Sequence, residues 1–578
     1  MKFIFTEHEN RGQEKNGNLR NGADILLDSL KFQGVELVFG YPGGAILPLY
    51  DAIYRQSFNN ILMRHEQGAV HAAEGYAKAT GKTGVVFVTS GPGATNTVTG
   101  IADAMSDSIP LVIFTGQVNC SSIGTDAFQE VNILSITAAI TKQSYQVRDV
   151  SELSEVVSKA FAISGSGRKG PVVVDLPKDV IAMLSDSKCD SAIVEDTSQK
   201  KVFIQKKAAA TMLQIRDALL RAKKPLILVG GGVIAAGAVP ELRSFAHKYK
   251  LPVVSTLLSL GAMPSSDPLS LGMGGMHGSY QANLAFCKCD FLLNIGSRFD
   301  DRLATNTSQF AQKACVVQID IDDSEFKKVV ATNFSVAADG KEALNWLLEN
   351  TSSFQLKEHN AWLRQLNTWK RKHPQHYIEE EGKIKPQAVI EEVGRLTAGD
   401  ATIVTDVGQH QMWVAQYYPF NRPHQIITSG GLGTMGFGLP AAIGAKLAVP
   451  EKEVVLFVGD GGIQMTIEEL DVIREYKLDI KIVMLNNKAL GMVRQWQDLF
   501  YKKRHSQTVF NEQPDFIKLA HAYDIKGLKL APQNWRETLA DVFTKKESVL
   551  VEADIPALEQ VYPMVAPGQS NRNMLGVD

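Results

Sequence analysis

Short apolar runs rich in Val, Ile and Leu recur along the chain and alternate with stretches in which apolar residues follow a helical period. The runs are residues 84–88, 111–115, 172–176, 226–229, 291–295, 316–319, 454–458 and 480–485. Uninterrupted apolar runs of this kind are typical of parallel strands buried on both faces. Because they alternate with helical stretches, the pattern predicts an α/β protein built from doubly wound parallel sheets.

Residues 185–201 are polar and patternless, and residues 355–385 are a charged stretch with spaced Trp362 and Trp369; both are predicted to be linkers. They divide the chain into three domains of similar size, which suits a length of 578 residues. The predicted domains are residues 21–190, 202–350 and 386–555, with a flexible N-terminal segment at 1–20 and a C-terminal tail at 556–578.

The first and third predicted domains share an order of features. In each, a Gly-rich loop (residues 89–93 and 428–431) leads through a helix of small residues to an apolar strand with a polar tip. This internal similarity predicts two related folds. In the middle domain the strand 226–229 runs into Gly230, Gly231 and Gly232, which fits a Rossmann-like dinucleotide-binding turn loosely.

Composition and charge narrow the class of protein. The formal net charge is −2 and no block of like charges is present, so binding to nucleic acid or to an anionic membrane surface is not expected. The five cysteines lack the spacing of a zinc site or a disulfide framework, which favours a reducing, cytoplasmic location. The N-terminal residues turn polar too soon for a signal peptide, and no apolar run approaches the roughly 18 residues of a membrane span.

Polar residues follow two of the predicted strands of the third domain. Asp460 comes directly after the run 454–458, and Asn487 follows the run 480–485. With a right-handed crossover between them, both residues lie at the carboxyl ends of parallel strands, where α/β sheets bind ligands. Carboxylate and amide oxygens suit Mg²⁺, and glycines such as Gly461 and Gly462 allow a phosphate to approach the backbone. The sequence therefore predicts a magnesium-phosphate site.

Glu66 stands between the strand-like residues 61–63 and an Ala-rich helix. Taken alone, it is explained as an acidic residue in the first turn of a helix, where the helix dipole favours negative charge. The residue types around Glu66 do not by themselves indicate a role in catalysis.

Several longer motifs in the chain resemble those of a known enzyme family. They are residues 39–45 (FGYPGGA), 124–130 (GTDAFQE), 408–413 (GQHQMW), 433–438 (GTMGFG) and 490–496 (LGMVRQW). Together with residues 459–461 (Gly-Asp-Gly) and 486–487 (Asn-Asn), they resemble acetohydroxyacid synthase, also called acetolactate synthase, in its biosynthetic form. The resemblance runs from about Gly22 to Pro567 and places the chain in the thiamine-diphosphate (ThDP) enzyme superfamily.

The resemblance implies ThDP and Mg²⁺ as cofactors. It assigns the metal to Asp460, Asn487 and the carbonyl of Ala489. It also implies that Glu66 activates the cofactor through its pyrimidine ring and that Met435 holds the cofactor in its bent shape. Gly44 would help to polarise the bound carbonyl, and Gln117 would reach the cofactor side of the pocket in a catalytic role. Further implied ThDP contacts are Val407, Gly408, Gln409, His410, Gly433, Gly461, Gly462, Gly491 and Met492.

The same resemblance implies a flavin that performs no net redox chemistry. Its FAD contacts would be Arg168, Gly230, Gly231, Gly232, Gly275, Met276, His277, Gly278, Arg298, Asp300, Asp320 and Asp322. Arg298 would also bind the carboxylate of the second 2-oxo acid, and Trp496 would form one side of the acceptor pocket. Phe128 and Lys178 would line the substrate entry. Without the resemblance, Arg298 is equally well explained by a surface ion-pair network and the aromatic residues by the core.

The implied reaction condenses two 2-oxo acids with loss of CO₂, in the first common step of branched-chain amino acid biosynthesis. Two pyruvates give 2-acetolactate, and pyruvate with 2-oxobutyrate gives 2-aceto-2-hydroxybutyrate. The implied assembly is a homodimer or a dimer of dimers with the active site at the interface, and a small regulatory subunit is left open. Where the family commonly has proline and then basic residues, this chain reads Asn119-Cys120-Ser121-Ser122, so inhibitor sensitivity is not implied.

Three alternatives remain at this point. A fermentative acetolactate synthase would use the same chemistry without FAD, and a pyruvate oxidase would reduce its flavin. A non-catalytic Rossmann-like binding or regulatory subunit would need neither Glu66 nor the metal ligands. The presence of Arg298 and Trp496 favours the biosynthetic synthase.

Overall fold

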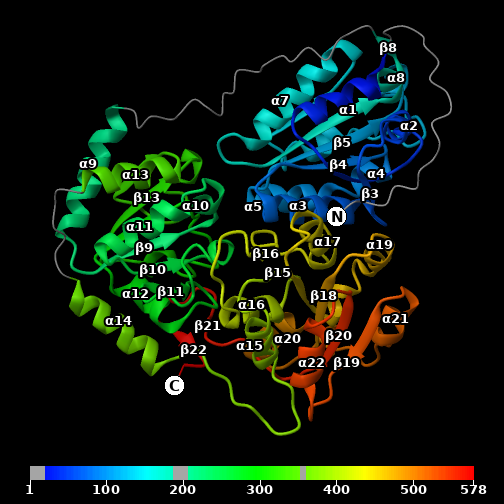
Figure 1. Ribbon diagram of the computed structural model, residues 1–578. Helices are drawn as coiled ribbons and strands as arrows, with labels where there is room; N and C mark the ends of the chain where they lie inside the picture. The colour runs from blue at the N-terminus through cyan, green and yellow to red at the C-terminus, as the bar shows by residue number, and fades with distance from the viewer. Residues whose placement is uncertain (1–19, 186–205, 352–358, 578) are drawn as a thin grey trace. The chain divides into compact units, whose positions relative to one another are not determined.

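The computed structural model describes residues 20–185, 206–351 and 359–577 (Figure 1). Most of the predicted N-terminal segment and of the first predicted linker lies outside these residues, as does the start of the second linker. The chain divides into two compact units. Unit 1 comprises residues 1–199, 440–452 and 471–476, and unit 2 comprises residues 200–439, 453–470 and 477–578.

Unit 1 contains a six-stranded parallel sheet in the order β3-β2-β4-β5-β7-β6. Its strands are β2 (Val38–Tyr41), β3 (Asn60–Leu62), β4 (Gly84–Val88), β5 (Leu111–Gln117), β6 (Gln143–Gln146) and β7 (Pro171–Pro177). The central strands β4, β5 and β7 are buried along their whole length, as their apolar runs predict.

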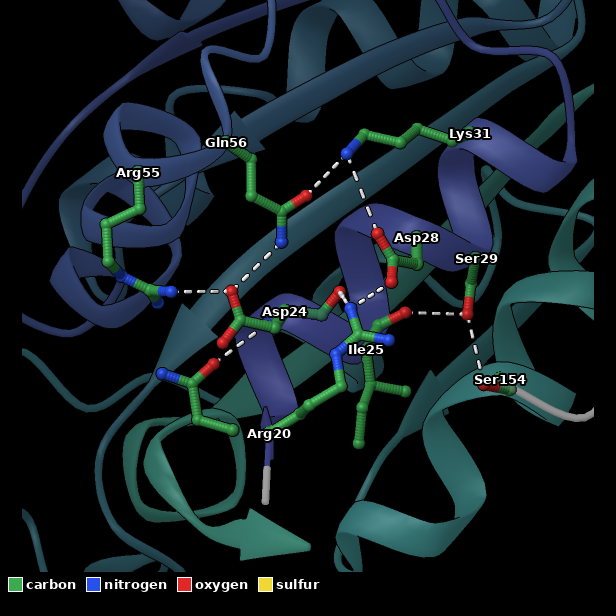
Figure 2. Close-up of polar contacts among 10 residues, drawn as sticks. Arg20, Asp24, Ile25, Asp28, Ser29, Lys31, Arg55, Gln56 and Ser154 are labelled. Atoms are coloured by element: carbon green, nitrogen blue, oxygen red, sulfur yellow. Dashed lines mark hydrogen bonds and ion pairs between the residues drawn. The ribbon is translucent and has the colours of Figure 1, made fainter. Parts of the chain in front are cut away.

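The helices of unit 1 include α1 (Gly22–Phe32), α2 (Leu47–Gln56), α3 (Glu66–Thr80), α5 (Val98–Asp107) and α7 (Leu153–Gly165), with the short helices α4 (Pro92–Thr95), α6 (Ile133–Thr137) and α8 (Lys178–Ala182). Asn21 begins α1 by accepting a hydrogen bond from the Asp24 amide over 2.8 Å, as an N-cap does. Asp24 in turn accepts hydrogen bonds from Arg55 and Gln56, and Ser29 meets Ser154 (Figure 2). These contacts join α1 to α2 and α7 beyond their shared apolar core.

Unit 2 contains a second parallel sheet, in the order β11-β10-β9-β12-β13-β14. Its strands are β9 (Pro225–Val229), β10 (Val253–Ser255), β11 (Ser270–Met273), β12 (Phe291–Ile295), β13 (Cys315–Asp320) and β14 (Phe334–Ala337). Numbered along the chain, this is the order 3-2-1-4-5-6 of the Rossmann fold. The prediction of a Rossmann-like middle domain is confirmed.

Alternate residues of β9 enter different cores. Ile227 and Val229 pack in a cluster with residues of α9 (Lys206–Arg221), α11 (Val239–Tyr249) and α13 (Gly340–Asn350). Leu226 and Leu228 pack in a second cluster with α12 (Tyr280–Lys288) and α14 (Asn360–Lys372). Because successive side chains of a strand point to opposite faces, helices cover both faces of this sheet, so it is doubly wound.

The third sheet, also in unit 2, has the order β16-β15-β17-β18-β20-β19 and is parallel throughout. Its strands are β15 (Thr402–Thr405), β16 (Ile426–Ile427), β17 (Val454–Gly459), β18 (Ile480–Asn486), β19 (Lys526–Lys529) and β20 (Val549–Asp554). Counted along the chain, the first and third sheets both follow the order 2-1-3-4-6-5. The predicted relation between the two folds is confirmed by this identical topology.

Helices α15 (Pro386–Leu396), α16 (Gln409–Tyr417) and α22 (Trp535–Phe543) share a core with the third sheet. The other helices in this part of the chain are α17 (Gly438–Ala448), α18 (Asp460–Ile463), α19 (Leu470–Glu475), α20 (Gly491–Phe500) and α21 (Phe516–Ala522). Among the described helices, none has the length and apolar character that a membrane span requires.

Candidate active site

The predicted site residues of unit 1 lie at one edge of its sheet. Gly44 follows β2, Glu66 follows β3 and begins α3, and Gln117 is the last residue of β5. Phe128 lies in the loop after β5, and Lys178 is the first residue of α8 after β7. Each of these positions is at the carboxyl end of a parallel strand, where sheets of this kind bind ligands.

Glu66 is held at the start of α3 and is 9% exposed. Its Oε2 accepts a hydrogen bond of 3.0 Å from the Asn96 side chain. A Cβ atom at Gly93 would lie 3.3 Å from Glu66 Oε1, so the glycine leaves that oxygen accessible from the Gly-rich loop. Asn96 was not predicted as a site residue, although it follows the predicted Gly-rich loop by three positions.

Gln117 is 2% exposed, and its side-chain amide is fixed by its neighbours. Nε2 donates to the Val131 carbonyl over 2.9 Å and to Asp175 Oδ2 over 3.3 Å, and Oε1 accepts from the Val118 amide over 2.9 Å. Asp175 was missed by the sequence analysis because it lies within an apolar strand, β7.

The loop carrying Phe128 is held in a defined shape while Phe128 itself is 88% exposed. The Glu130 carboxylate accepts hydrogen bonds from the backbone amides of Gly124 and Ala127, which lowers the pKa of that carboxyl. Asp126 and Gln129, on either side of Phe128, adopt left-handed backbone conformations with φ of 58° and 61°. A large apolar side chain presented in this way suits contact with another molecule.

In unit 2 the three predicted metal ligands lie together. Asp460 begins α18 directly after β17, and Asn487 follows β18. Asn487 Oδ1 accepts a hydrogen bond of 3.1 Å from the Ala489 amide, and the same amide also interacts with the Asp460 carboxylate. Two oxygen-bearing side chains and the backbone of Ala489 thus lie together at the carboxyl ends of adjacent strands, and carboxylate and amide oxygens suit Mg²⁺.

Asp460 is 1% exposed, and burial raises the pKa of its carboxyl to about 6. The side-chain amide of Gln513 donates to Oδ2. Among the described residues, no cationic side chain contributes to the pKa of this carboxyl, and a bound cation would stabilise its charged form. Gln513 was not predicted, because it lies in a polar loop far along the chain.

His410 offers an unused polar atom beside this site. It lies at the start of α16, and its Nε2 is buried without a hydrogen-bond partner among the described residues. Burial lowers the pKa of the imidazole to about 4. A Cβ atom at Gly408 or Gly459 would come within 3.0 or 3.2 Å of the ring. A phosphate oxygen beside Nε2 would favour the protonated ring, so this position fits the diphosphate of a cofactor.

Gln409 and Gly491 complete this arrangement. Gln409 Oε1 accepts from Asn487 Nδ2 over 3.0 Å, while Gln409 Nε2 donates to Gln495 Oε1 and to the Glu559 carbonyl. A Cβ atom at Gly491 would lie 2.1 Å from Gln409 Oε1, so a glycine is required there. The next residue, Met492, is partly buried against the core of the third sheet.

The loop that carries Met435 is organised by Asp406. The Asp406 carboxylate accepts from the backbone amides of Gly436 and Gly438 over 3.0 and 2.9 Å, and a Cβ atom at Gly462 would come within 2.5 Å of it. Met435 is half-buried, and the loop also contains Gly433. Asp406 directly precedes the predicted contact Val407, and its carboxylate fixes the backbone of this loop.

The predicted flavin residues of unit 2 lie at the carboxyl edge of the Rossmann sheet. Gly230, Gly231 and Gly232 follow β9, Gly275 to Gly278 follow β11, Arg298 and Asp300 follow β12, and Asp320 and Asp322 end β13. Cβ atoms at Gly230 and Gly232 would lie 2.0 and 2.7 Å from Gly296, so the loops after β9 and β12 approach closely at the point where the strand order reverses. Dinucleotides bind at such a switch point.

The side chain of His277 suits a ligand bound at this edge of the sheet. Its Nδ1 is buried without a partner in the described part of the chain, and burial lowers the pKa of the ring to about 4. Beside it, Met276 donates its backbone amide to the Arg302 carbonyl, and Gly275 has a φ of +107°. Arg168, in unit 1, donates from Nε to Ser108 Oγ over 2.9 Å.

Arg298 and Trp496 are the predicted acceptor-pocket residues. Within the described ranges, the Arg298 guanidinium forms no hydrogen bond and no ion pair, and its charge acts on the nearby Asp300. Arg302, in the same loop, lies with Cζ 5.9 Å from the centroid of the Trp496 ring. The loop after β12 and helix α20 are therefore neighbours, and an uncommitted guanidinium suits a carboxylate ligand.

Three sequence families match this chain. "Thiamine pyrophosphate enzyme, N-terminal TPP binding domain" covers residues 20–136, the central domain of the same enzymes covers residues 212–347, and the C-terminal TPP binding domain covers residues 406–553.

Curated relatives match over nearly the full length. The acetolactate synthase large subunit of Lactococcus lactis subsp. lactis (strain IL1403) is 50% identical over 564 residues, covering 96% of this chain and 96% of that protein. The acetolactate synthase isozyme 3 large subunit of Escherichia coli (strain K12) is 45% identical over 560 residues, covering 95% of this chain and 97% of that protein. The large subunit of Haemophilus influenzae (strain ATCC 51907 / DSM 11121 / KW20 / Rd) is 45% identical over 562 residues, covering 96% and 98%.

Proposed function

Because this chain belongs to the acetolactate synthase large subunits, a family of thiamine pyrophosphate enzymes, we propose that it condenses two 2-oxo acids with loss of CO₂. The donor is pyruvate, and the acceptor is a second pyruvate or 2-oxobutyrate. The products, 2-acetolactate and 2-aceto-2-hydroxybutyrate, are precursors of the branched-chain amino acids. The observation that carries the proposal is the convergence of Asp460, Asn487 and Ala489 beside His410, whose buried Nε2 has no hydrogen-bond partner among the residues that the structure describes.

The cofactor would be anchored by its diphosphate. Asp460, Asn487 and the Ala489 carbonyl would hold Mg²⁺, and His410 with the start of α16 would contact the phosphates. ThDP supplies, when bound, an electron sink for the negative charge left on a 2-oxo acid when CO₂ departs. The loop fixed by Asp406 would place Met435 against the cofactor.

Glu66 would exchange a proton with the pyrimidine ring of the cofactor. Its Oε2 is engaged by Asn96, so Oε1 is the oxygen with capacity left for this task. Burial of the side chain at the start of α3 keeps water from competing for the proton. Gly44 and Gln117, at the ends of β2 and β5, would contact the reacting groups.

Arg298 would hold the acceptor through the acceptor's carboxylate, since its guanidinium forms no hydrogen bond or ion pair with the described residues and matches a carboxylate bidentately. Trp496 would pack against the alkyl group of the acceptor and favour 2-oxobutyrate; one methylene is worth about 1–3 kcal/mol in such a pocket. Phe128 and Lys178 would line the entry.

We propose FAD as a second cofactor, held at the carboxyl edge of the Rossmann sheet by the glycine turns and His277. The close approach of Gly230 to Gly296 supports it, as does His277 Nδ1, which is buried without a partner in the described part of the chain. The four free cysteines in the described part of the chain support a reducing, cytoplasmic location.

One incubation tests the reaction. Purified protein with ThDP, Mg²⁺ and equal concentrations of pyruvate and 2-oxobutyrate should form both products, with 2-aceto-2-hydroxybutyrate in excess, without oxygen uptake. Absorbance near roughly 450 nm that persists on adding pyruvate would support a bound flavin without net redox chemistry. Failure to form either product would overturn the proposed function, and a pyruvate-biased mixture would overturn the role of Trp496 alone.

We further propose a homodimer, or a dimer of dimers, in which Glu66 of one chain serves the magnesium site of its neighbour. Separately inactive Glu66→Gln and Asp460→Asn chains should then regain roughly a quarter of the wild-type activity when unfolded, mixed in equal amounts and refolded, because half of the dimers are mixed and each mixed dimer has one intact site. Recovery of no activity, while mixed wild-type controls refold fully, would contradict a shared site.

A further inference from the structure

Asp175 lies at the centre of a polar cluster on one face of the unit 1 sheet. It is 0% exposed and is in register with Thr115 on β5 and with Gln146 on β6, so the three side chains share a face. Asp175 Oδ1 accepts from Thr115 Oγ1 over 2.8 Å, and Oδ2 accepts from Gln146 Nε2 over 2.9 Å. Gln117, two residues beyond Thr115 on the same face, donates to Oδ2 over 3.3 Å.

An ionised carboxylate accepts hydrogen bonds and has none to donate, so it selects the NH₂ end of the Gln117 amide. The two Nε2 hydrogens are then used, one by Asp175 and one by the Val131 carbonyl. Gln117 Oε1 accepts from the Val118 amide and retains one lone pair. With its NH₂ group engaged, Gln117 has an acceptor, and no donor, left for a ligand at the strand end.

We propose that Asp175 is a positioning residue that fixes the orientation of the Gln117 amide, so that Gln117 presents its carbonyl oxygen to the site. This inference rests on the proposed function, in which Gln117 contacts the reacting groups. The group that Gln117 meets is therefore a hydrogen-bond donor, such as a hydroxyl or an amino group. It is not the carboxylate of a 2-oxo acid, which needs donors and is left to Arg298.

The charge state of Asp175 controls this arrangement. Burial raises the pKa of its carboxyl to about 6, and its three neutral donors lower it in part; no charged side chain contributes. Above that pH the carboxylate accepts from Gln117 Nε2. Below it, the protonated carboxyl donates a hydrogen bond of its own, and the orientation of the Gln117 amide is left to the Val131 carbonyl and the Val118 amide.

The test compares two single variants. Asp175→Leu keeps the branched shape of the side chain but removes both acceptor oxygens, so the side chain at this position no longer selects the NH₂ end of the Gln117 amide. We expect kcat for acetolactate formation to fall about tenfold or more, with KM for pyruvate changed less than kcat, because the lost contact orients a group that acts on the reacting atoms. Thr115→Val is the matched control: it removes a hydrogen bond from the same carboxylate without touching Gln117, and should keep kcat within about twofold.

Two further measurements keep the proposal falsifiable if Asp175→Leu folds poorly. Gln117→Glu would place two carboxylates face to face, so the acid limb of its kcat profile should move upward by about one pH unit or more as they share a proton. The wild-type profile should lose activity below about pH 6. An unshifted Gln117→Glu profile, or a folded Asp175→Leu variant with wild-type kcat, would overturn the proposal. An inactive wild-type protein would instead overturn the proposed function, so the two failures are distinguishable.

Discussion

Asn487 Nδ2 donates a hydrogen bond of 3.0 Å to Gln409 Oε1, which joins a proposed metal ligand to a proposed diphosphate contact. Because Asn487 uses its NH₂ group in this bond, its Oδ1 is the end left for a cation. Gln409 is itself held by Gln495 and by the Glu559 carbonyl. The orientation of the metal ligand is thus set by residues that do not touch the metal.

Replacing Gln409 tests that relationship. Gln409→Met should weaken Mg²⁺ binding in the presence of ThDP by about 10–100-fold, the usual cost of removing a residue that orients a metal ligand. Titration of activity and of protein fluorescence with Mg²⁺ measures it. Gln411→Leu, which removes two buried hydrogen bonds on the same helix, is the control and should change the Mg²⁺ requirement little. An unchanged requirement in Gln409→Met would contradict the role given to Gln409.

The Glu66→Gln variant tests cofactor activation. At saturating ThDP, turnover should fall by about 10²–10⁴, the usual contribution of a general acid–base group. ThDP binding, followed separately by fluorescence, should persist, because the amide keeps the shape of the side chain. Glu36→Gln, at an exposed residue paired loosely with Lys82, is the control and should be fully active. Near wild-type turnover in Glu66→Gln would remove Glu66 from the mechanism.

The proposed metal site requires a glycine at position 491 for steric reasons. In Gly491→Ala the new methyl group would lie 2.1 Å from Gln409 Oε1 and 2.4 Å from Asn487 Nδ2, so both side chains must move. We expect a loss of stability of about 1–3 kcal/mol and a large loss of Mg²⁺-dependent activity. Gly165→Ala, where no atom lies within 4 Å of the added methyl group, provides the comparison. Denaturant unfolding and activity assays on both variants measure these effects. Equal stability and equal Mg²⁺-dependent activity in the two variants would refute the steric argument.

Glu130 holds the loop that presents Phe128. Glu130→Gln replaces a carboxylate that accepts from two backbone amides with a weaker neutral acceptor. Chymotrypsin should then cleave after Phe128 several-fold faster, and KM for pyruvate should rise. Glu155→Gln, in an exposed helical ion pair with Lys159, should change neither quantity. If the cleavage rate at Phe128 is unaltered in Glu130→Gln, the carboxylate does not hold the loop.

The buried ring of His277 should make the stability of the folded protein sensitive to acid. Its pKa is about 4 in the folded protein against 6.5 in the unfolded chain, so between these values the unfolded state binds the extra proton. The contribution of His277 to the free energy of unfolding is therefore fully present above pH 6.5. It is lost as the pH falls toward 4, and the loss over this range is roughly 3 kcal/mol. Urea unfolding from pH 7 to 4.5 should be less pH-dependent in His277→Gln. Parallel pH curves for the two proteins would show that His277 is not the group responsible.

The sequence predicted the central strands, which are buried on both faces, but not an edge strand whose residues are partly exposed. The runs 111–115 and 454–458 lie within β5 and β17, because a strand covered on both faces is apolar at every position. The edge strand β6 (Gln143–Gln146) was not predicted, because its partly exposed polar residues carry no such signal.

Likewise, the sequence by itself determined that Asp460 and Asn487 end neighbouring strands, since each position follows directly from its own apolar run. Only the tertiary structure decided that Asp406 fixes the Met435 loop and that Asp175 meets Gln117. Those pairs lie on different elements, and which oxygen faces which amide depends on strand order, register and buried hydrogen bonds that no local pattern encodes.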